Sequence, residues 1–455
     1  MLIRFTVANY LSFKEPTELS FVPAAGIANH EGHVVSATTP NGIDVLKLGV
    51  IYGANASGKS NLVRAIHTAQ SIVLHPVEKR KNLPFVPFKL DEESAIKPTR
   101  FEFEIMVEGH CYAYGFVYSL HQIEEEWLYK INALDEKCIF ERTAQEFRFP
   151  GLHSSNDEAN QFLNFTAKGT PPNRLFLTEC DERDVEAVVP DSKAIFEVGD
   201  WFANRLLIIF PESKFEGLAS DVYASEPFKN ELAKYLQCFD TGIAGISTVK
   251  DDFQSINIPQ HIRQKIEADF QEGGQILLAD RDDSRWLLKK ENAIIRAFRV
   301  VSEHSKENGD HLVNFDLKEE SDGTRRLMDL APAMMSLLLS DCDLIIDELD
   351  RSLHPDISHS YIDNFLRYST KRHSQLIVTT HEVSLLDQHF LRPDEIWLVD
   401  KGGDGVSHLT ALTEYKLNQT KDLERDYRQG RFGGIPVLRD FSWLDAPKED
   451  HAETT

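Results

Sequence analysis

The eight residues at 53–60, which read GANASGKS, constrain this chain more than any other segment. They follow an apolar run at 46–52 that predicts a buried strand, and from Asn61 onward the apolar residues fall on one face of a predicted helix. The pattern GxxxxGKS between a strand and a helix is typical of a phosphate-binding loop. The alternative is a glycine-rich turn that binds nothing, and the two flanking elements favour the phosphate site.

The chemistry of such a loop comes from its backbone and from two side chains. Glycines let the chain curl so that successive N–H groups face one anion, and the start of the helix adds a partial positive charge. We expect Lys59 to reach the β- and γ-phosphates of ATP and to act in catalysis, and the Ser60 hydroxyl to ligate Mg²⁺. The predicted nucleotide-binding residues are Gly53, Ala54, Asn55, Ala56, Ser57, Gly58, Lys59, Ser60 and Asn61.

A second buried strand is predicted at 343–348, and it ends in two adjacent carboxylates. Desolvating a carboxylate is costly, and the carboxyl edge of a parallel sheet is where ligands bind. We expect Asp347 to hold Mg²⁺, directly or through water, and Glu348 to orient or deprotonate the attacking water. The alternative is a solvated strand end without a function.

A third strand, predicted at 375–381, ends in His381. A neutral imidazole at a strand end can bond a γ-phosphate and sense its loss. A lone histidine in this place is usually structural, but the acid pair at 347–348 shortly before it favours the catalytic interpretation.

The segment 320–326, ESDGTRR, precedes a helical pattern at 324–340 in which Pro332 predicts a kink or a helix junction. Ser321 and Gly323 could simply cap that helix. The same geometry also makes a second anion site, and the loop at 53–60 already serves the chain's own nucleotide. The segment therefore hints at a site that another molecule completes.

Composition limits the partners and the compartment. The chain has 455 residues with 49 basic and 73 acidic side chains, so its net charge of −24 repels nucleic acid and anionic membranes on average. Basic clusters at 78–81 and at Arg425, Arg428 and Arg431 are interpreted as solvated helix faces, with phosphate or partner contact as the alternative. No apolar run approaches the ~18 residues of a membrane span, and residues 1–20 lack a signal-peptide pattern. Five widely spaced cysteines without a CxxC pair fit buried, reduced thiols, so we expect a cytoplasmic protein.

The motif residues together resemble the ABC-type ATPases, and more closely their soluble SMC-like and OLD-like branch. The tail at 427–436, YRQGRFGGIP, resembles the ending of the RloA- and AbiL-like ATPases found with restriction and abortive-infection loci. In the order of the chain, 9–14 resembles that branch's first-strand signature, 53–60 its Walker A, 321–326 its ABC signature, 344–348 its Walker B, Asp350 its D-loop and His381 its switch histidine.

The resemblance implies a mechanism in which two heads sandwich two nucleotides. Ser321 and Gly323 of one chain would contact the γ-phosphate held by Lys59 of the other, and hydrolysis at Glu348 would release the pair. Thr324 and Asp350 are further nucleotide-binding residues that the resemblance implies. The implied partner is thus a second copy, as a head-to-head dimer or a higher homo-oligomer. Candidates for the Q-loop are Gln122 or 84–91, and candidates for adenine stacking are Phe13 or Lys14.

The strands that alternate with helices predict an α/β fold with a parallel, helix-covered sheet. A strongly alternating stretch at 99–118 around 108–109 predicts a hairpin, whereas 227–237 and 261–271 are helical patterns. With the resemblance, this divides the chain into an N-terminal ATPase lobe with an antiparallel β subdomain (1–150), an inserted, mainly helical lobe (151–300) and a C-terminal ATPase lobe (301–455).

We expect an ATPase subunit of a bacterial anti-phage, abortive-infection type system that controls a separate nuclease or toxin. The chain after Walker B is too short for a Toprim nuclease like that of OLD proteins. The alternative is an SMC- or RecF-like ATPase of DNA repair or DNA handling, which predicts a long coiled coil and a basic surface that the sequence does not show. A transporter subunit or a translation factor is disfavoured by the single motif set and by the large insertion after Walker A.

Overall fold

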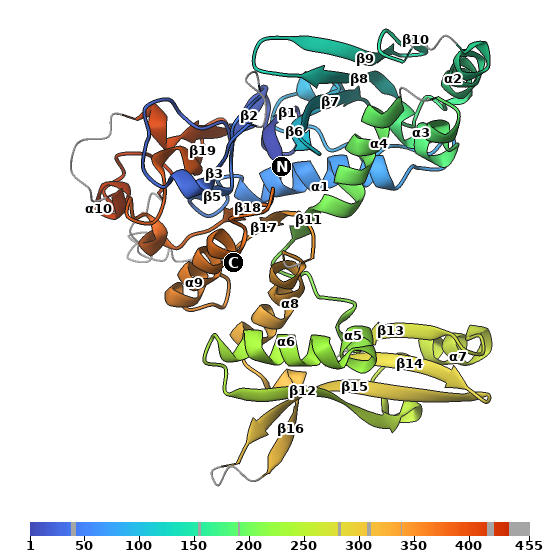
Figure 1. Cartoon of the computed structure of the whole chain (residues 1–455), viewed down its shortest axis with the longest axis vertical. Helices are drawn as coiled ribbons and strands as arrows, with labels where there is room; N and C mark the ends of the chain where they lie inside the picture. The colour runs from blue at the N-terminus through green and yellow to red at the C-terminus, as the bar shows by residue number, and fades with distance from the viewer. Residues whose placement is uncertain are drawn as a thin grey trace, which may run out of the picture.

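The computed structural model contains a seven-stranded, a six-stranded and a five-stranded sheet, together with a short two-stranded pair (Figure 1). The expected α/β fold is confirmed. The tail predicted at 427–436 is described up to Ile435, and Pro436 lies outside the described residues. The structure describes residues 1–37, 42–152, 156–189, 192–280, 284–306, 311–337, 339–415 and 423–435.

The N-terminal sheet has seven antiparallel strands. The hairpin predicted at 99–118 is present, and its turn falls on Glu108 and Gly109, which both have positive φ (50° and 76°). Such a turn suits the right-handed twist of the strands on either side. In sheet order the strands are β10 (Glu146–Arg148), β9 (Glu136–Thr143), β8 (Ile123–Ile131), β7 (His110–Tyr118), β6 (Thr99–Val107), β1 (Leu2–Ala8) and β2 (Thr17–Ser20). A separate short pair joins β3 (Val34–Val35) to β4 (Val45–Leu46).

The central sheet carries the motifs. Its first five strands are parallel and only the last, β20, is antiparallel. All its parallel strands therefore present their carboxyl ends at one edge, which is where such sheets bind ligands. In sheet order the strands are β11 (Leu206–Ile209), β17 (Asp343–Ile346), β18 (Gln375–Thr379), β5 (Leu48–Gly53), β19 (Ile396–Lys401) and β20 (Ser407–Ala411).

Both faces of the central sheet are covered, which explains its near-continuous apolar strands. On one face, Ile51, Ile345 and Ile377 pack in the core that contains α1 (Lys59–Leu74) and the inner side of the N-terminal sheet. The opposite face packs against α8 (Asp322–Ser336) and α9 (Pro355–Tyr368), with α10 (Leu423–Arg428) in the same core. The predicted kink residue Pro332 lies inside α8.

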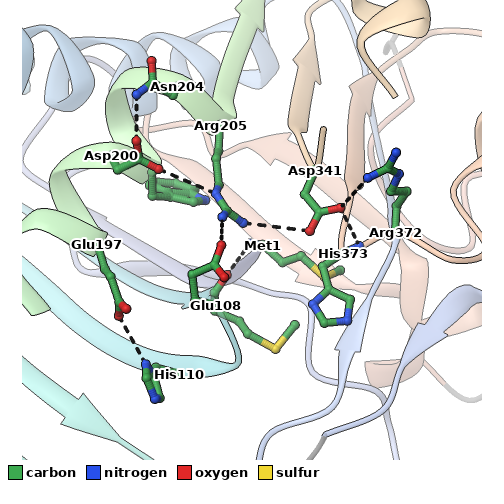
Figure 2. A network of polar contacts seen from close by, with 12 residues as sticks. Met1, Glu108, His110, Glu197, Asp200, Asn204, Arg205, Asp341, Arg372 and His373 are labelled. Carbon is green, nitrogen blue, oxygen red and sulfur yellow. Dashed lines mark hydrogen bonds and ion pairs between the residues drawn. The ribbon is translucent and has the colours of Figure 1, made fainter. Parts of the chain in front are cut away.

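Residues 151–205 do not form a separate lobe. Their helices pack against α1 and the N-terminal sheet, and a π-helical turn at Trp201–Arg205 leads into β11. Figure 2 shows Arg205 of this turn beside Glu108 of the hairpin turn and Asp341, which precedes β17. These ion pairs tie the start of the Walker B strand to the N-terminal lobe. The helices are α2 (Asp157–Gly169), α3 (Phe176–Glu182) and α4 (Lys193–Asp200).

The region predicted as a mainly helical lobe at 151–300 contains strands as well as helices. A five-stranded antiparallel sheet occupies much of this region and continues to Asp316. Figure 1 shows this lobe projecting from the rest of the chain, with α8 leading back toward the central sheet. Helices cover parts of both sheet faces, so the strands lack the alternation that marks a half-exposed sheet. The lobe contains α5 (Leu218–Ala224), α6 (Glu226–Gln237), β12 (Ile243–Asp252), α7 (Gln260–Asp269), β13 (Gln275–Ala279), β14 (Arg285–Glu291), β15 (Ile294–Ser305) and β16 (Leu312–Asp316).

Two expectations from composition can be compared with the fold. The five cysteines are free, as expected, but Cys238 is exposed and so has no buried structural role. Among the described residues, no helix has the length and apolar character needed to cross a membrane.

Candidate nucleotide site

The loop at 53–60 curls back over its own lysine. β5 ends at Gly53, and α1 begins at Lys59. The Lys59 ammonium donates hydrogen bonds to the carbonyl oxygens of Gly53 (2.8 Å) and Ala54 (3.2 Å). Burial lowers the pKa of Lys59 to about 8, although the negative charges of Asp347, Glu348 and Asp350 oppose this shift. The Lys59 ammonium thus lies inside the loop, at the place where phosphate is expected to bind.

Both glycines of the motif lie too close to neighbouring strands to carry a side chain. A Cβ at Gly53 would lie 2.4 Å from the carbonyl oxygen of Val399 in β19. A Cβ at Gly58 would lie 2.2 Å from the hydroxyl of Ser407, and Gly58 also has a φ of 123° that side chains rarely adopt. The GxxxxG spacing therefore reflects packing against β19 and β20 as well as backbone freedom.

A chain of three hydroxyl-mediated hydrogen bonds lies beneath the loop. The Asn61 amide donates to the Ser12 hydroxyl (2.8 Å), which lies 2.8 Å from the Ser407 hydroxyl, and Ser407 donates to the carbonyl oxygen of Ser57 (2.5 Å). The Ser407 hydroxyl is the donor toward both Ser12 and the Ser57 carbonyl, so it connects the N-terminal segment to the centre of the loop. Ser12 and Ser407 are both buried.

The predicted acid pair lies at the end of β17. Asp347 is 2% exposed, and its Oδ1 accepts a hydrogen bond of 2.6 Å from Thr379 at the end of β18. The Thr379 hydroxyl in turn accepts the backbone N–H of Glu348 (2.8 Å). Glu348 has a left-handed backbone (φ 50°), which is uncommon for a residue with a side chain and concentrates at functional turns. Its side chain remains 35% exposed.

The D-loop and the switch segment are joined directly. The backbone N–H of His381 donates to both carboxylate oxygens of Asp350 (3.2 and 3.4 Å). Burial, and secondly the positive charge of Lys59, lower the pKa of His381, while the nearby acids oppose the shift. The imidazole is therefore neutral at pH 7. The structure thus brings Lys59, Asp347, Glu348, Asp350 and His381 into one electrostatic cluster, as the strand ends predicted.

The signature segment begins α8 and also packs on the D-loop turn. Ser321 is the N-cap of α8, and its hydroxyl accepts the Thr324 N–H (3.0 Å), so the capping role weighed for it is present. A Cβ at Gly323 would lie 2.6 Å from the carbonyl oxygen of Ser352. Within the described residues, no hydrogen bond or ion pair joins 321–324 to the loop at 53–61. The exposed Ser321 thus does not complete its own chain's phosphate loop.

One arginine connects the signature helix to Walker B. Arg326 of α8 donates to the carbonyl oxygens of Asp347 (3.2 Å) and Phe210 (2.9 Å). Three residues further along the helix, Asp329 forms a buried ion pair of 2.5 Å with Arg285 of the lobe sheet. Helix α8 thus contacts both the carboxyl end of β17 and the lobe sheet.

Some expected residues take other roles. Phe13 is fully buried in the core, so it cannot stack on an adenine in this structure, whereas Lys14 pairs with Asp91 (3.5 Å). Gln122, in the turn between β7 and β8, donates to Glu124 of β8 (2.8 Å). The segment 84–91, the other Q-loop candidate, lies against the N-terminal signature, where the Val86 carbonyl accepts the Leu11 N–H (3.0 Å).

Two residues of the site were not found from the sequence, Thr379 and Ser407. Thr379 is the last residue of a predicted strand, and aligning the ends of β17 and β18 would have identified it. No local signal marks Ser407, because its role depends on β20 pairing back along β19 beside the loop.

Residues 48–387 match a protein family described as "AAA domain, putative AbiEii toxin, Type IV TA system". The match spans well over half of the chain and includes the phosphate loop, the acid pair and His381. The chain belongs to this family. Membership in this AAA-domain family makes the chain a P-loop protein of the ATPase class with a nucleotide site.

Solved structures similar to this AAA-domain chain include two SMC heads. The SMC head domain from Thermotoga maritima has 13% identity and a TM-score of 0.37, with 91% of this chain and 99% of that chain covered. An SmcHead bound to the C-winged helix domain of ScpA has 13% identity and a TM-score of 0.39, with 90% and 97% covered. No curated protein matches the chain.

Proposed function

We propose that this chain binds ATP at the loop 53–61 and hydrolyses it with groups at the ends of β17 and β18. One observation carries the proposal: a buried lysine, two adjacent acids and a neutral histidine converge at the carboxyl edge of a parallel sheet. A phosphate loop alone would support nucleotide binding. The convergence of a candidate base with a phosphate-contacting imidazole supports turnover.

The site suits magnesium by its donor chemistry. Ser60 offers a hydroxyl and Asp347 a carboxylate, which are the oxygen ligands that this ion takes alongside phosphate oxygens and water. Within the described residues, no group of three or more His, Cys, Asp or Glu side chains could hold a metal by itself. That fits an ion bound jointly with a nucleotide. Mg²⁺ bound there would neutralise charge on the β- and γ-phosphates.

Each residue of the chain then has a role in the reaction. The Lys59 ammonium leaves the Gly53 and Ala54 carbonyls for phosphate oxygens, while the loop amides hold the rest of the phosphate charge. Glu348 orients the attacking water and accepts its proton, and the neutral His381 donates to the γ-phosphate. The bond between Asp350 and the His381 backbone keeps the switch residue at the strand edge.

The signature residues Ser321, Gly323 and Thr324 support a site completed in trans. The start of α8 presents an exposed serine and a helix dipole but does not contact its own phosphate loop. We propose that a second copy supplies these groups, so that ATP joins two heads and hydrolysis releases them. The assembly is a head-to-head dimer or a larger homo-oligomer built from such pairs.

The biological role we propose is that of an ATPase subunit in an anti-phage defence system of the RloA- and AbiL-like kind, controlling a separate nuclease or toxin effector. The motif set and the tail at 427–436 support this assignment. The family's description, which names a toxin of a type IV toxin–antitoxin system, supports a setting of this kind.

The test is turnover by the purified full-length chain with ATP and Mg²⁺. Wild type is expected to release phosphate, Lys59→Ala to lose nucleotide binding, and Glu348→Gln to bind ATP without hydrolysing it. Hydrolysis by Glu348→Gln at the wild-type rate would contradict the assignment of the base.

A further inference from the structure

The C-terminal residues 423–435, which we call the tail clamp, are anchored next to the nucleotide site. Leu423, Tyr427 and Phe432 are 2%, 7% and 6% exposed and belong to the same apolar core as Leu385 and Tyr52. A surface tail would not bury three large side chains in this way. The clamp is therefore part of the folded ATPase core.

One end of the clamp lies on the segment that follows the switch histidine. Helix α10 packs against the short helix Val383–Leu385, which begins two residues after His381. The contact is apolar, because Leu385 and Leu423 are both buried in it. Any movement of the segment after His381 would therefore change its packing against α10.

The other end of the clamp lies on the first glycine of the phosphate loop. Gly434 has a left-handed backbone (φ +68°), and a Cβ there would lie 3.6 Å from the Cα of Gly53. The Tyr427 hydroxyl donates to the Gly434 carbonyl (2.9 Å) and so fixes the turn at this place. Gly53 is the residue whose carbonyl oxygen holds Lys59.

Tyr52 connects the two ends. Its ring centroid lies 5.9 Å from that of Tyr427, and it directly precedes Gly53 in β5. Its hydroxyl is buried and has no hydrogen-bond partner within the described residues. Burial, and then the neighbouring Tyr427, Asp350 and Glu382, raise its pKa. The acids of the D-loop and the switch segment thus lie close to this tyrosine.

The arginines of the clamp pair locally. Arg428 bonds Glu424 (2.9 Å) and Arg431 bonds Asp426 (2.7 Å), both within the clamp itself. These pairs agree with the solvated helix face expected for this basic cluster. The contacts that reach the nucleotide site come instead from tyrosine, glycine and apolar side chains.

We infer that the tail clamp holds the first glycine of the phosphate loop and the segment after His381 in a fixed relation, and that hydrolysis depends on this relation more than ATP binding does. Tyr427 and Gly434 are its positioning residues. The inference rests on the proposed ATPase function. It assigns the tail motif a task within one chain, separate from any contact between two heads.

The experiment compares Tyr427→Phe and Gly434→Ala with Gly273→Ala in the full-length protein. Gly273 also has a left-handed backbone (φ +75°), but nothing lies within 4 Å of a Cβ there. The alanine variants at Gly273 and Gly434 therefore carry similar backbone strain, while only Gly434 lies next to the phosphate loop. For each variant, kcat, the Kd for ATP and Tm are measured. Loss of the Tyr427 hydrogen bond is expected to lower kcat about fivefold, with Kd changed by less than about twofold.

Support consists of a fall in kcat for both clamp variants, a Kd near the wild-type value, and wild-type kcat in Gly273→Ala. The inference is overturned if the clamp variants keep the wild-type kcat, if kcat and ATP affinity fall together, or if Gly273→Ala loses as much kcat. A wild-type protein that hydrolyses no ATP would instead refute the proposed function, and this inference with it. An active wild type with unaltered clamp variants refutes only the inference.

Discussion

The Thr379 hydroxyl lies 2.6 Å from Oδ1 of Asp347 and 2.8 Å from the backbone nitrogen of Glu348. One side chain of β18 therefore hydrogen-bonds to both acidic residues that follow β17. Its hydrogen must go to the carboxylate, because its oxygen accepts the N–H. The bond to the Glu348 backbone also stabilises the left-handed conformation of that residue.

Thr379→Val should keep the volume of the side chain and remove both bonds. A buried N–H left without a partner costs about 1–3 kcal/mol, so we expect a lower Tm and a drop in kcat of about tenfold or more. Thr379→Ser keeps the hydroxyl and serves as the control. Equal kcat in the valine and serine variants would show that this hydroxyl does not position the acids.

Ser407→Ala should break the hydroxyl chain at its last step and free the Ser57 carbonyl. We expect ATP affinity to fall about three- to tenfold, because a less ordered loop loses more conformational entropy when it binds phosphate. The matched control is Ser369→Ala, which removes another buried hydroxyl bonded to a carbonyl, that of Leu366 (3.4 Å). Titration of both variants with a fluorescent ATP analogue, together with Tm, separates loop positioning from general destabilisation.

The motif residues could be predicted because each belongs to a local pattern. The carboxyl ends of parallel strands meet at one edge of a sheet, so Gly53, Asp347 and His381 could be placed together from the predicted strand ends. Ser407 could not be found in this way, because its contact with the loop depends on how β20 folds back beside β19.

The lobe sheet was missed for a different reason. β14 begins with Arg285, which is buried against Asp329 of α8, and ends in Lys289, Lys290 and Glu291. Buried charge and a charged strand end hide the period-two pattern. The charged residue at the buried position is satisfied only by a partner far away in sequence, which no local window includes.

The pH dependence of nucleotide capture should follow Lys59. Its pKa of about 8 in the free protein means that its charge is lost as the pH rises through 8. We expect kcat/KM for ATP to fall on the alkaline side from about pH 8, since kcat/KM reports groups of the free enzyme. On the acid side, kcat/KM should decline only at pH values below 6.5, the ordinary pKa of histidine. Burial and the charge of Lys59 lower the pKa of His381, so its imidazole stays neutral down to a lower pH.

Stability should change in the opposite direction over the same alkaline range. The folded state releases the Lys59 proton near pH 8 and the unfolded chain near its ordinary value of 10.5, so the unfolded state binds more protons between these limits. The contribution of Lys59 to the free energy of unfolding therefore rises with pH there. The Tm difference between wild type and Lys59→Ala, followed from pH 7 to 10, measures it. A constant difference would show that Lys59 is not desolvated.

Ser321→Arg should block hydrolysis and spare ATP binding if the signature acts in trans. The side chain also caps α8, so loss of the cap must be controlled. Ser225 caps α6 in the lobe in the same way and accepts the Phe228 N–H (3.2 Å). Ser225→Arg is expected to cost about 1 kcal/mol of stability, like Ser321→Arg, but to leave hydrolysis intact. If Ser321→Arg loses ATP binding and hydrolysis equally, the site is not completed by a second copy.

Glu348→Gln should trap the ATP-bound assembly. The amide keeps the shape of the side chain but cannot accept a proton, so hydrolysis should fall at least about a hundredfold while nucleotide stays bound. The mass of the complex with ATP and Mg²⁺ should then be a multiple of 51.8 kDa, apart from any bound effector. Adding Lys59→Ala to this variant removes the nucleotide and should return the protein to its unassembled mass. An assembly that persists in the double variant would show that ATP does not join the heads, even if the chain hydrolyses it.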